Sequence, residues 1–251
     1  VNSSELTINN SELSMDNYRY RVSVSGTCVP PAYSQHATLY VLANPHVNYQ
    51  PESSEICEND NTTFEAYVSG NDLTYKWQVN NGAGFTDISD SEYYSGSDTL
   101  RLNITNAPVS FNSNRYRLKI TDKCGTYYSN EALLTVNTNP SANITGDDSF
   151  PLVCGGAELN LDGNPSGGSG PYLWHKWTGA IAPLSTTSAQ QTVFKTLLHG
   201  DYELTYTVTD SKHCKGTSTV TIENNKPEAD FISNAVPSCG FLEVNFTNQS
   251  K

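Results

Sequence analysis

Apolar and polar residues alternate strictly in the segment 115–120. Tyr116, Leu118 and Ile120 occupy every second position, and each position between them is Arg or Lys. An extended chain points successive side chains to opposite faces, so this period of two predicts a β-strand with one buried and one solvated face. The same period in 20–24, at Tyr20, Val22 and Val24, predicts a second strand of this kind.

Other segments carry the same period and extend the prediction over the chain. Apolar residues alternate in 64–68, 75–79, 159–161 and 202–208, and Asn81-Gly82 is typical of a hairpin turn. In 173–177 the alternation places Leu173, His175 and Trp177 on one face and Trp174 on the other. The residues expected in the core are Trp77, Tyr116, Trp177 and Tyr206. Fifteen Tyr and a single Met agree with an all-β fold.

An internal repeat divides the chain into domains. Leu6–Cys28 aligns without gaps on Leu102–Cys124, 96 residues later, and both copies contain Arg-Tyr-Arg and end in Cys. This spacing is the length of one immunoglobulin-like β-sandwich. The expected divisions are the C-terminal half of a domain (1–44), a complete immunoglobulin-like domain (45–138), a second β-sandwich (139–225) and the N-terminal strands of a further domain (226–251).

Six cysteines are widely spaced, without a C-x-x-C pair or a Cys/His cluster of zinc-ligand spacing. Disulfide bonds, and therefore an oxidising compartment, are the better interpretation. One cysteine lies early and one late in each of the two sandwich segments. The predicted bonds are Cys57–Cys124 and Cys154–Cys214, with Cys28 and Cys239 unpaired in this chain.

Charge and hydropathy exclude two classes of partner. The formal net charge is -12, from 26 acidic and 14 basic residues, so the protein would repel a phosphate backbone, and nucleic acid is not expected to bind. No apolar run approaches the roughly 18 to 20 residues needed to cross a bilayer, so no membrane insertion is expected in this segment. The first residues, VNSSELTINN, lack the zones of a signal peptide, and a secretion signal is expected outside this chain.

Several segments resemble a known group of proteins. They are YKWQVNNGAGFTDISD and NRYRLKITDKCG in 45–138, and CGGAELNLDGNPSGGSGPY and YELTYTVTDSKHCKG in 139–225. With them the chain resembles, over nearly its whole length, the tandem immunoglobulin-like and PKD-like repeats of large Bacteroidetes adhesins exported by the type IX system and used in gliding. The segment 227–250 resembles the first strands of a PKD domain. In the domain 139–225, HKWTGAIAPL stands where the W-D-F-G-D-G segment of the PKD family would fall. The PKD likeness of this domain is therefore one of architecture.

The resemblance implies an extracellular, cell-surface location, an array of domains and neighbouring repeats of the same chain as partners. Our first hypothesis is a stalk or adhesion segment that spaces a binding region from the cell. A second is a ligand-binding module that recognises a glycan or protein through loops such as 80–98 or 163–171. A third is an accessory segment of a secreted hydrolase.

No pattern of catalytic residues is present. The five His residues are scattered, without an H-E-x-x-H or G-x-S-x-G companion, so the chain is not expected to be an enzyme. The run GNPSGGSG (163–170) lacks the Gly-Lys-Ser/Thr of a phosphate loop and predicts a turn between strands. Trp174, on the face opposite Trp177, is a candidate for stacking on a sugar, although an exposed aromatic is more often an incidental surface residue.

Calcium is the one cofactor that the sequence suggests. The candidate ligands are Asp147, Asp148, Asp210 and Glu223, because Ca²⁺ takes several carboxylate and carbonyl oxygens. No Asp-x-Asp-x-Asp run accompanies them, and ordinary solubilising charge is the simpler interpretation.

Overall fold

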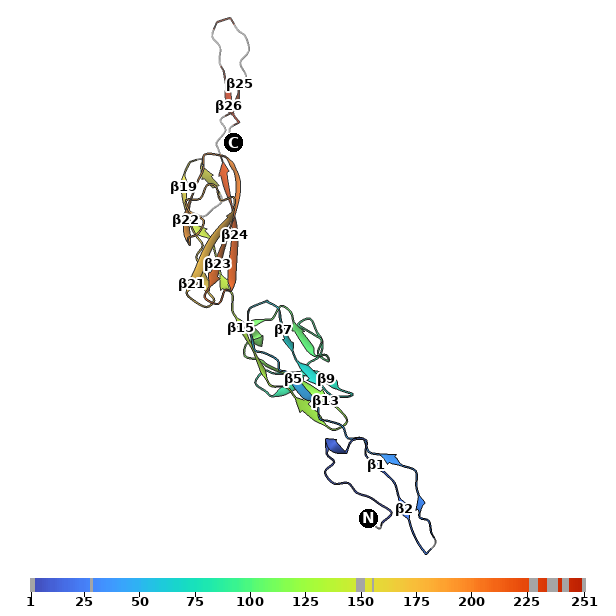
Figure 1. Ribbon diagram of the computed structural model, residues 1–251. Helices are drawn as coiled ribbons and strands as arrows, with labels where there is room; N and C mark the ends of the chain where they lie inside the picture. Colours follow the sequence, from blue (N-terminus) through green and yellow to red (C-terminus); the bar gives the residue numbers. More distant parts are fainter. Residues whose placement is uncertain are drawn as a thin grey trace. The chain divides into compact units, whose positions relative to one another are not determined.

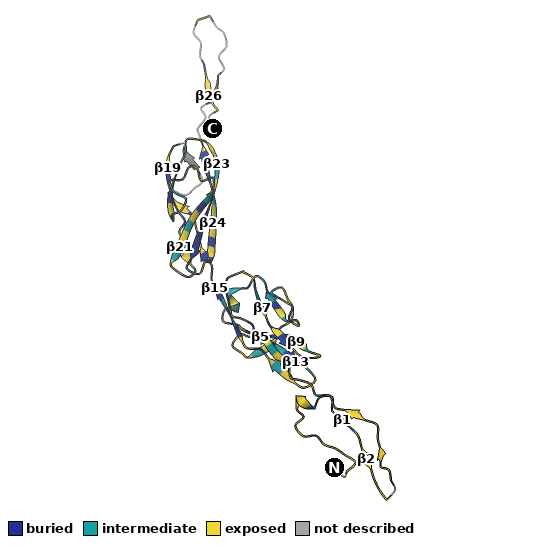
Figure 2. Ribbon diagram, in the orientation of Figure 1, coloured by how far each residue is buried: buried dark blue, intermediate teal, exposed yellow. Residues whose placement is uncertain are grey.

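The chain folds into two compact units, Val1–Val136 (unit 1) and Asn137–Lys251 (unit 2) (Figure 1). The computed structural model describes residues 3–27, 29–147, 152–154, 156–225, 230–233, 239–240 and 244–249. Their regular structure is β-strand, apart from the short 3₁₀ helices η1 (Leu13–Met15) and η2 (Val109–Phe111). The predicted all-β fold is confirmed. Each unit has a buried core of its own, which Figure 2 shows as dark segments surrounded by exposed ones.

Unit 1 contains two groups of strands that enclose its core. The larger sheet has the order β10-β9-β13-β15-β6, and β14 also pairs with β13. Its strands are β6 (Ser54–Cys57), β9 (Thr74–Asn80), β10 (Phe85–Asp87), β13 (Arg115–Thr121), β14 (Thr126–Tyr128) and β15 (Ala132–Asn137). Opposite lie the ladders β11-β12-β7 and β5-β8. Their strands are β5 (His46–Tyr49), β7 (Thr62–Glu65), β8 (Tyr67–Ser69), β11 (Tyr94–Ser95) and β12 (Arg101–Ile104).

The register of β9 against β13 turns one side of both strands into the core. Trp77 lies opposite Leu118, and both are fully buried. Across the sandwich Phe64 of β7 stacks on Tyr116 of β13 with ring centroids 4.8 Å apart. The indole N–H of Trp77 donates to the carbonyl oxygen of Thr99 at 2.9 Å. The large aromatic residues thus fill the space between the sheets, and the polar atom of the largest one is satisfied.

The outer side of the same strands holds the predicted row of basic residues. The guanidinium of Arg117 lies over two rings, 3.8 Å from the centroid of Phe85 and 4.0 Å from that of Tyr128. Its Nε donates to Gln78 Oε1 at 2.9 Å. Lys119 pairs with Asp87, 3.3 Å away. Arg117 and Lys119 therefore contact side chains of their own unit. Stacking on the face of an aromatic ring is favourable for the arginine guanidinium.

Unit 2 repeats this strand order. Its four-stranded sheet runs β18-β24-β23-β21, and the ladders β17-β19-β22 and β16-β20 form the other side. The strands are β16 (Pro140–Ser141), β17 (Thr145–Gly146), β18 (Leu152–Cys154), β19 (Glu158–Asp162), β20 (Ser166–Gly167), β21 (Tyr172–Gly179), β22 (Gln191–Lys195), β23 (Gly200–Asp210) and β24 (Lys215–Asn225). Both units therefore have the two-sheet order of an immunoglobulin-like sandwich.

The core tryptophans of the two units occupy equivalent places. Trp177 of β21 is 1% exposed, and its indole N–H donates to the carbonyl oxygen of Ala189 at 2.9 Å. This acceptor precedes β22 by two residues, just as Thr99 precedes β12 by two. Tyr206 of β23 packs against Trp177 at a centroid distance of 5.0 Å and is fully buried. The same sequence period has produced the same local packing twice.

A bulge in β21 overturns one detail of the predicted alternation. The pairing of β21 with β23 shifts between Tyr172 and Trp174. Leu173, expected on the inner face with Trp177, is 42% exposed. The extra residue at the bulge breaks the period of two at that point, so Leu173 leaves the core side while Trp177 keeps it.

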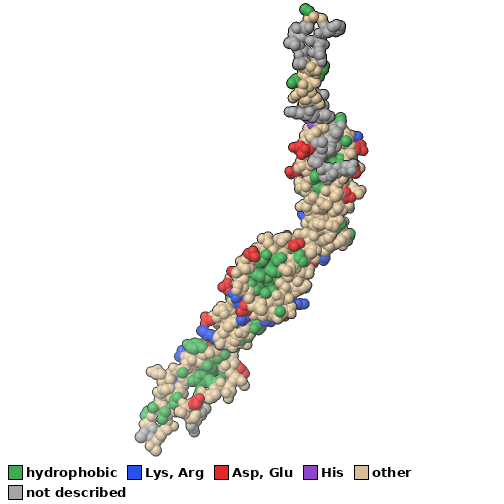
Figure 3. Space-filling view, turned by 180° about the vertical axis from the view of Figure 1, so that it is seen from behind, with side chains coloured by type: hydrophobic (Ala, Val, Ile, Leu, Met, Phe, Trp, Pro, Cys, Tyr) green, Lys and Arg blue, Asp and Glu red, His purple; other side chains and the backbone are tan. Residues whose placement is uncertain are grey.

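The N-terminal hairpins depart further from expectation. The described part of 1–44 forms only the two-stranded ladders β1 (Arg19–Tyr20) with β4 (Ala37–Thr38) and β2 (Ser23–Val24) with β3 (Ala32–Tyr33). Val22 and Val24, predicted to be buried, are 60% and 64% exposed. Figure 3 shows hydrophobic side chains at this surface. No facing sheet covers these hairpins among the described residues, so the alternation has nothing to pack against.

The C-terminal segment forms another hairpin, of β25 (Phe231–Ser233) and β26 (Phe246–Asn248). Phe231 and Phe246 contact each other edge to face, with centroids 5.1 Å apart, and both are exposed. The assignment of this segment to a further domain therefore stays a prediction.

Both predicted disulfide bonds are wrong in this structure. Cys57 is disulfide-bonded, but Cys124 is a free, exposed thiol in the turn that follows β13. In unit 2 the backbone of Cys154 pairs with Asn225, at the far end of β24 from Cys214. Eleven residues of strand span about 36 Å, whereas the Cα atoms of a disulfide lie about 4.4–6.8 Å apart. Cys214 is disulfide-bonded, but its partner cannot be Cys154.

Cys28 and Cys239 were predicted to be unpaired in this chain. Cys239 is free and exposed, whereas Cys28 lies outside the described residues. The two predicted bonds rested on the early and late positions of the cysteines in each sandwich segment. Among the described residues of unit 1, however, the buried core contains no cysteine, and Phe64 and Tyr116 contact each other between the sheets.

These thiol states can be checked by alkylation. Iodoacetamide added to the native chain without reductant should label Cys124 and Cys239 and leave Cys57 and Cys214 unlabelled, because a disulfide sulfur is not alkylated. Peptide mass spectrometry before and after reduction measures each site. A nonreduced peptide that links Cys124 to Cys57 would restore the original pairing.

Candidate functional site: a polar groove in unit 2

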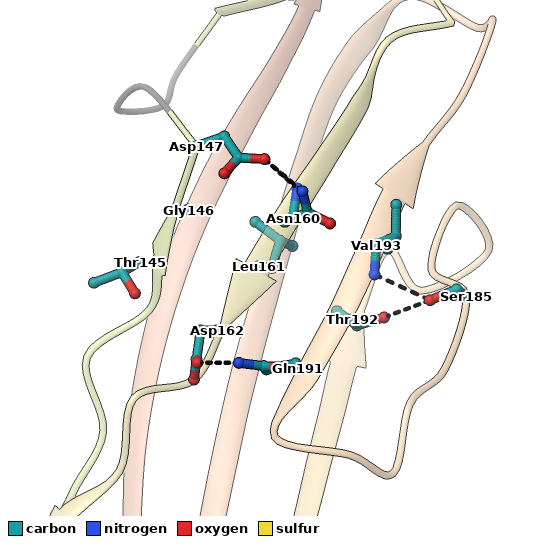
Figure 4. A pocket seen from close by; sticks show the side chains of 10 residues that line it. All are labelled: Thr145, Gly146, Asp147, Asn160, Leu161, Asp162, Ser185, Gln191, Thr192 and Val193. Atoms are coloured by element: carbon teal, nitrogen blue, oxygen red, sulfur yellow. Dashed lines mark hydrogen bonds between the residues drawn. The ribbon is translucent and has the colours of Figure 1, made fainter.

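A groove of about 500 Å³ crosses the outer face of β17, β19 and β22 (Figure 4). We call it the polar groove, because most of its side chains carry oxygen or nitrogen. It is lined by Thr145, Gly146, Asp147, Asn160, Leu161, Asp162, Ser185, Gln191, Thr192 and Val193.

The alternation of β19 creates the floor of the groove. In the sequence ELNLD, Leu159 and Leu161 are buried, which turns Asn160 and Asp162 to the outer face. The register then brings Gln191 of β22 opposite Asp162. On the other side Thr145 of β17 lies opposite Asp162 as well. Three strands thus place a row of polar side chains side by side.

Hydrogen bonds hold the two carboxylates of the groove. Asp147 accepts from the backbone N–H of Asn160 at 3.2 Å and from its side-chain amide at 2.6 Å. Asp162 accepts from the side-chain amides of Gln190 and Gln191, each at 2.8 Å, and from the backbone N–H of Asn164 at 2.8 Å. Figure 4 shows Asp162 directed toward Gln191. Both carboxylates therefore already accept hydrogen bonds from groups of the protein itself.

These contacts keep Asp162 ionised. Partial burial acts to raise its pKa, but the hydrogen bonds from Gln191, Gln190 and Asn164 outweigh that effect, and the pKa lies below its ordinary value. A carboxyl group with a lowered pKa is a hydrogen-bond acceptor at neutral pH and not a general acid.

The groove also contains a hydroxyl group, at Ser185, that is held by hydrogen bonds. Its hydroxyl group at Ser185 accepts from the backbone N–H of Val193 at 3.0 Å and lies 3.3 Å from the hydroxyl of Thr192. Among the described residues that line the groove, none is a His, Lys or Cys that could activate this hydroxyl. Amide, hydroxyl and carboxylate groups in a row suit a hydroxyl-rich or peptide ligand, which can both donate and accept hydrogen bonds.

The structure separates the predicted calcium ligands. Asp147 lies in the polar groove, and Asp148 lies outside the described residues. Asp210 is fully buried at the end of β23, beside the start of β24. Glu223 is exposed near the opposite end of β24. Within the part of the chain that the structure describes, no three His, Cys, Asp or Glu side chains gather in a way that could hold a metal ion.

The predicted loops and aromatics take the following places. The segment 163–170 joins β19 to β21 and contains β20, as a turn between strands should. Trp174 lies on β21 and is 56% exposed. Trp77, Tyr116, Trp177 and Tyr206 are buried in the two cores. The groove residues Asn160, Asp162 and Gln191 were not singled out from the sequence. The alternation in 158–162 already turned two of them outward, but only strand pairing brings them beside β22.

The lowered pKa of Asp162 predicts an acid-sensitive unit 2. A carboxyl group whose folded pKa lies below its unfolded value of about 3.9 stabilises the fold above that value, and this stabilisation is lost as the pH falls through the folded pKa. We therefore expect the melting temperature of unit 2 to drop below about pH 4. Asp162→Asn should lower it at pH 7 and flatten its dependence on acid, while Asp201→Asn at an exposed position should do neither. An unchanged acid profile in the Asp162 variant would contradict the assignment.

The fold defines a class: a chain of immunoglobulin-like β-sandwich units, of which unit 2 carries a polar groove on its surface. No protein-family model matches the chain. Among curated proteins it is similar to the human dyslexia-associated protein KIAA0319, with 26% identity over 248 residues. That match covers 88% of this chain but only 22% of the human protein.

Solved structures of immunoglobulin-domain arrays also overlap with the chain. Domains 3–5 of Drosophila OTK match with a TM-score of 0.41 and 11% identity, over 86% of this chain and 73% of that one. The four N-terminal Ig domains of a Dscam1 isoform match with a TM-score of 0.38 and 14% identity, over 84% and 55%. The fold assignment rests on the sheet order of each unit and not on these overlaps. No helix among the described residues is long and apolar enough to cross a membrane.

Proposed function

We propose that this chain is a spacer and attachment segment of an extracellular cell-surface protein. The observation that carries the proposal is modularity, because each unit encloses a separate hydrophobic core. The connection is short: β15 ends at Asn137 and β16 begins at Pro140, with two residues between them. Domains that fold separately on short connections form arrays in which each module keeps its structure under load. The sequence resemblance to repeats of Bacteroidetes gliding adhesins supports an attachment role at the surface.

A domain exchange tests this role in cells that make the protein. Residues 45–138 are replaced by a second copy of 139–225, and a second strain lacks 45–225 altogether. A spacer depends on the number of modules and not on their surface, so the exchange should leave attachment of the cells to a surface near the wild-type level, while the deletion should reduce it. Surface labelling with an antibody controls for export.

Two results would overturn the proposal. If the deletion leaves attachment unchanged, the segment has no attachment role. If the exchange is as harmful as the deletion, unit 1 supplies a specific contact that a spacer would not need.

The polar groove favours a second candidate, a recognition module. Its accessible Asn160 and Gln191 amides could bind a polar ligand without a catalytic step. Binding of unit 2 to a glycan array, lost in an Asn160→Ala, Gln191→Ala double variant that a melting curve shows to be folded at the assay temperature, would support this candidate. Equal binding by the variant would exclude the groove as its site.

A further inference from the structure

The sheet of unit 2 that faces away from the polar groove carries an exposed tryptophan. Trp174 of β21 is 56% exposed, and its ring stacks on that of His213 with centroids 5.5 Å apart and planes inclined by 22°. His213 lies in the turn between β23 and β24 and adopts a left-handed backbone conformation, with φ of 65°. The contact between these rings holds Trp174 in place while more than half of its surface stays open.

Cross-strand pairing places two lysines on the face that Trp174 occupies. Trp174 lies opposite Thr209, which lies opposite Lys215 on β24. Two residues further along β21, Lys176 lies opposite Thr207, which lies opposite Thr217 on β24. Residues opposite one another share a face of the sheet and lie about 5 Å apart. Thr209 is only 6% exposed, so the surface that these two rows present consists of Trp174, Lys176, Thr207, Lys215 and Thr217. We call this surface the Trp174 platform.

The charge of the platform is opposite to that of the protein. Lys176 and Lys215 are exposed, and neither forms a salt bridge with a described residue. The two rows contain no carboxylate. Glu203 is six residues from Thr209 along β23, or about 20 Å. Asp210 is fully buried. A chain with a net charge of -12 thus presents two uncompensated cations beside an open aromatic ring.

We propose that the Trp174 platform binds an acidic glycan, a sugar ring that carries a carboxylate or sulfate. The apolar face of a pyranose packs on an indole ring, the lysines attract the anion, and the hydroxyls of Thr207 and Thr217 donate to or accept from sugar hydroxyls. An exposed sheet face is open at its edges and suits a polymer better than a small enclosed molecule. The assignment is independent of the spacer role, because it concerns only the surface of unit 2.

Fluorescence titration tests the platform on the intact chain. Trp77 and Trp177 are buried, so a change in tryptophan emission on binding reports chiefly on Trp174. The probe is an oligogalacturonate of defined length, with a neutral malto-oligosaccharide of similar length and a polyglutamate peptide as comparators. We expect saturable binding of the acidic sugar, weakened by salt, and binding of both comparators weaker by about tenfold or more, since each lacks one of the two recognised features.

Variants assign the binding to named residues, with calorimetry as the readout where Trp174 is absent. Trp174→Ala should abolish binding, and a Lys176→Gln, Lys215→Gln double variant should weaken it by about tenfold or more. Lys195→Gln, an exposed lysine on the opposite sheet, is the matched control and should bind like the wild type. Melting curves verify that each variant is folded.

Three outcomes would overturn the proposal. The first is no binding of the acidic sugar at millimolar concentration, and the second is equal affinity for the neutral sugar. The third is binding that Trp174→Ala leaves unchanged, which would reveal a general attraction of polyanions. None of these results bears on the domain exchange, so failure of the platform and failure of the spacer role are distinguishable.

Discussion

Trp177→Ala should destabilise unit 2 by about 3–5 kcal/mol and leave unit 1 unchanged, and Trp77→Ala should do the reverse. Both indoles are almost completely buried, and each donates a hydrogen bond across its unit at 2.9 Å. Removing either ring leaves a cavity and an unpaired carbonyl oxygen, and the neighbouring aromatic loses its contact. The cores share no residue, so each loss stays in one unit.

Chemical denaturation measures the two units separately. Reductant is present so that disulfide bonds do not contribute, and hydrogen exchange with mass spectrometry follows peptides from 64–136 and 144–222. Trp174→Ala is the matched control, because this exposed residue should change the free energy of unfolding by less than about 0.5 kcal/mol. If either core substitution lowered the stability of both units equally, the separate cores would not be independent and the modular interpretation would be wrong.

Asp210→Ala should destabilise unit 2 by about 3–5 kcal/mol, although Asp210 belongs to no binding site. Its carboxylate is fully buried and accepts from the backbone N–H groups of Ser169, Lys212 and Cys214 at 2.8–2.9 Å. These bonds hold the turn between β23 and β24 and join it to the segment before β21. Alanine would leave three amide donors without an acceptor, two of them in the turn that also positions His213.

The same denaturation experiment tests this role. Asp210→Asn retains one acceptor oxygen and should cost less than alanine. Asp201→Ala, at an exposed position on the same strand, should stay within about 0.5 kcal/mol of the wild type. If Asp210→Ala also stayed within that range, the buried carboxylate would contribute nothing net, and its hydrogen bonds would only offset the cost of burying the charge.

Within the two cores the sequence by itself determined which residues lie on the buried side of their strands. The period of two placed Trp77, Tyr116 and Leu118 on the core side, and the structure buries all three. In unit 2 it did the same for Trp177 and Tyr206. This information is local, because a strand directs alternate side chains to opposite faces whatever its neighbours are.

Tertiary structure decided everything that depends on which strands become neighbours. Cys57 and Cys124 open and close one domain in the sequence, but Cys124 is a free thiol while Cys57 is disulfide-bonded, so the two are not joined. Asp162 meets Gln191, and Trp174 meets His213, only because distant segments pair in one register. A period of two states the face on which a residue lies. Partners and register depend on packing over the whole unit, and a single bulge, as at Leu173, changes the face itself.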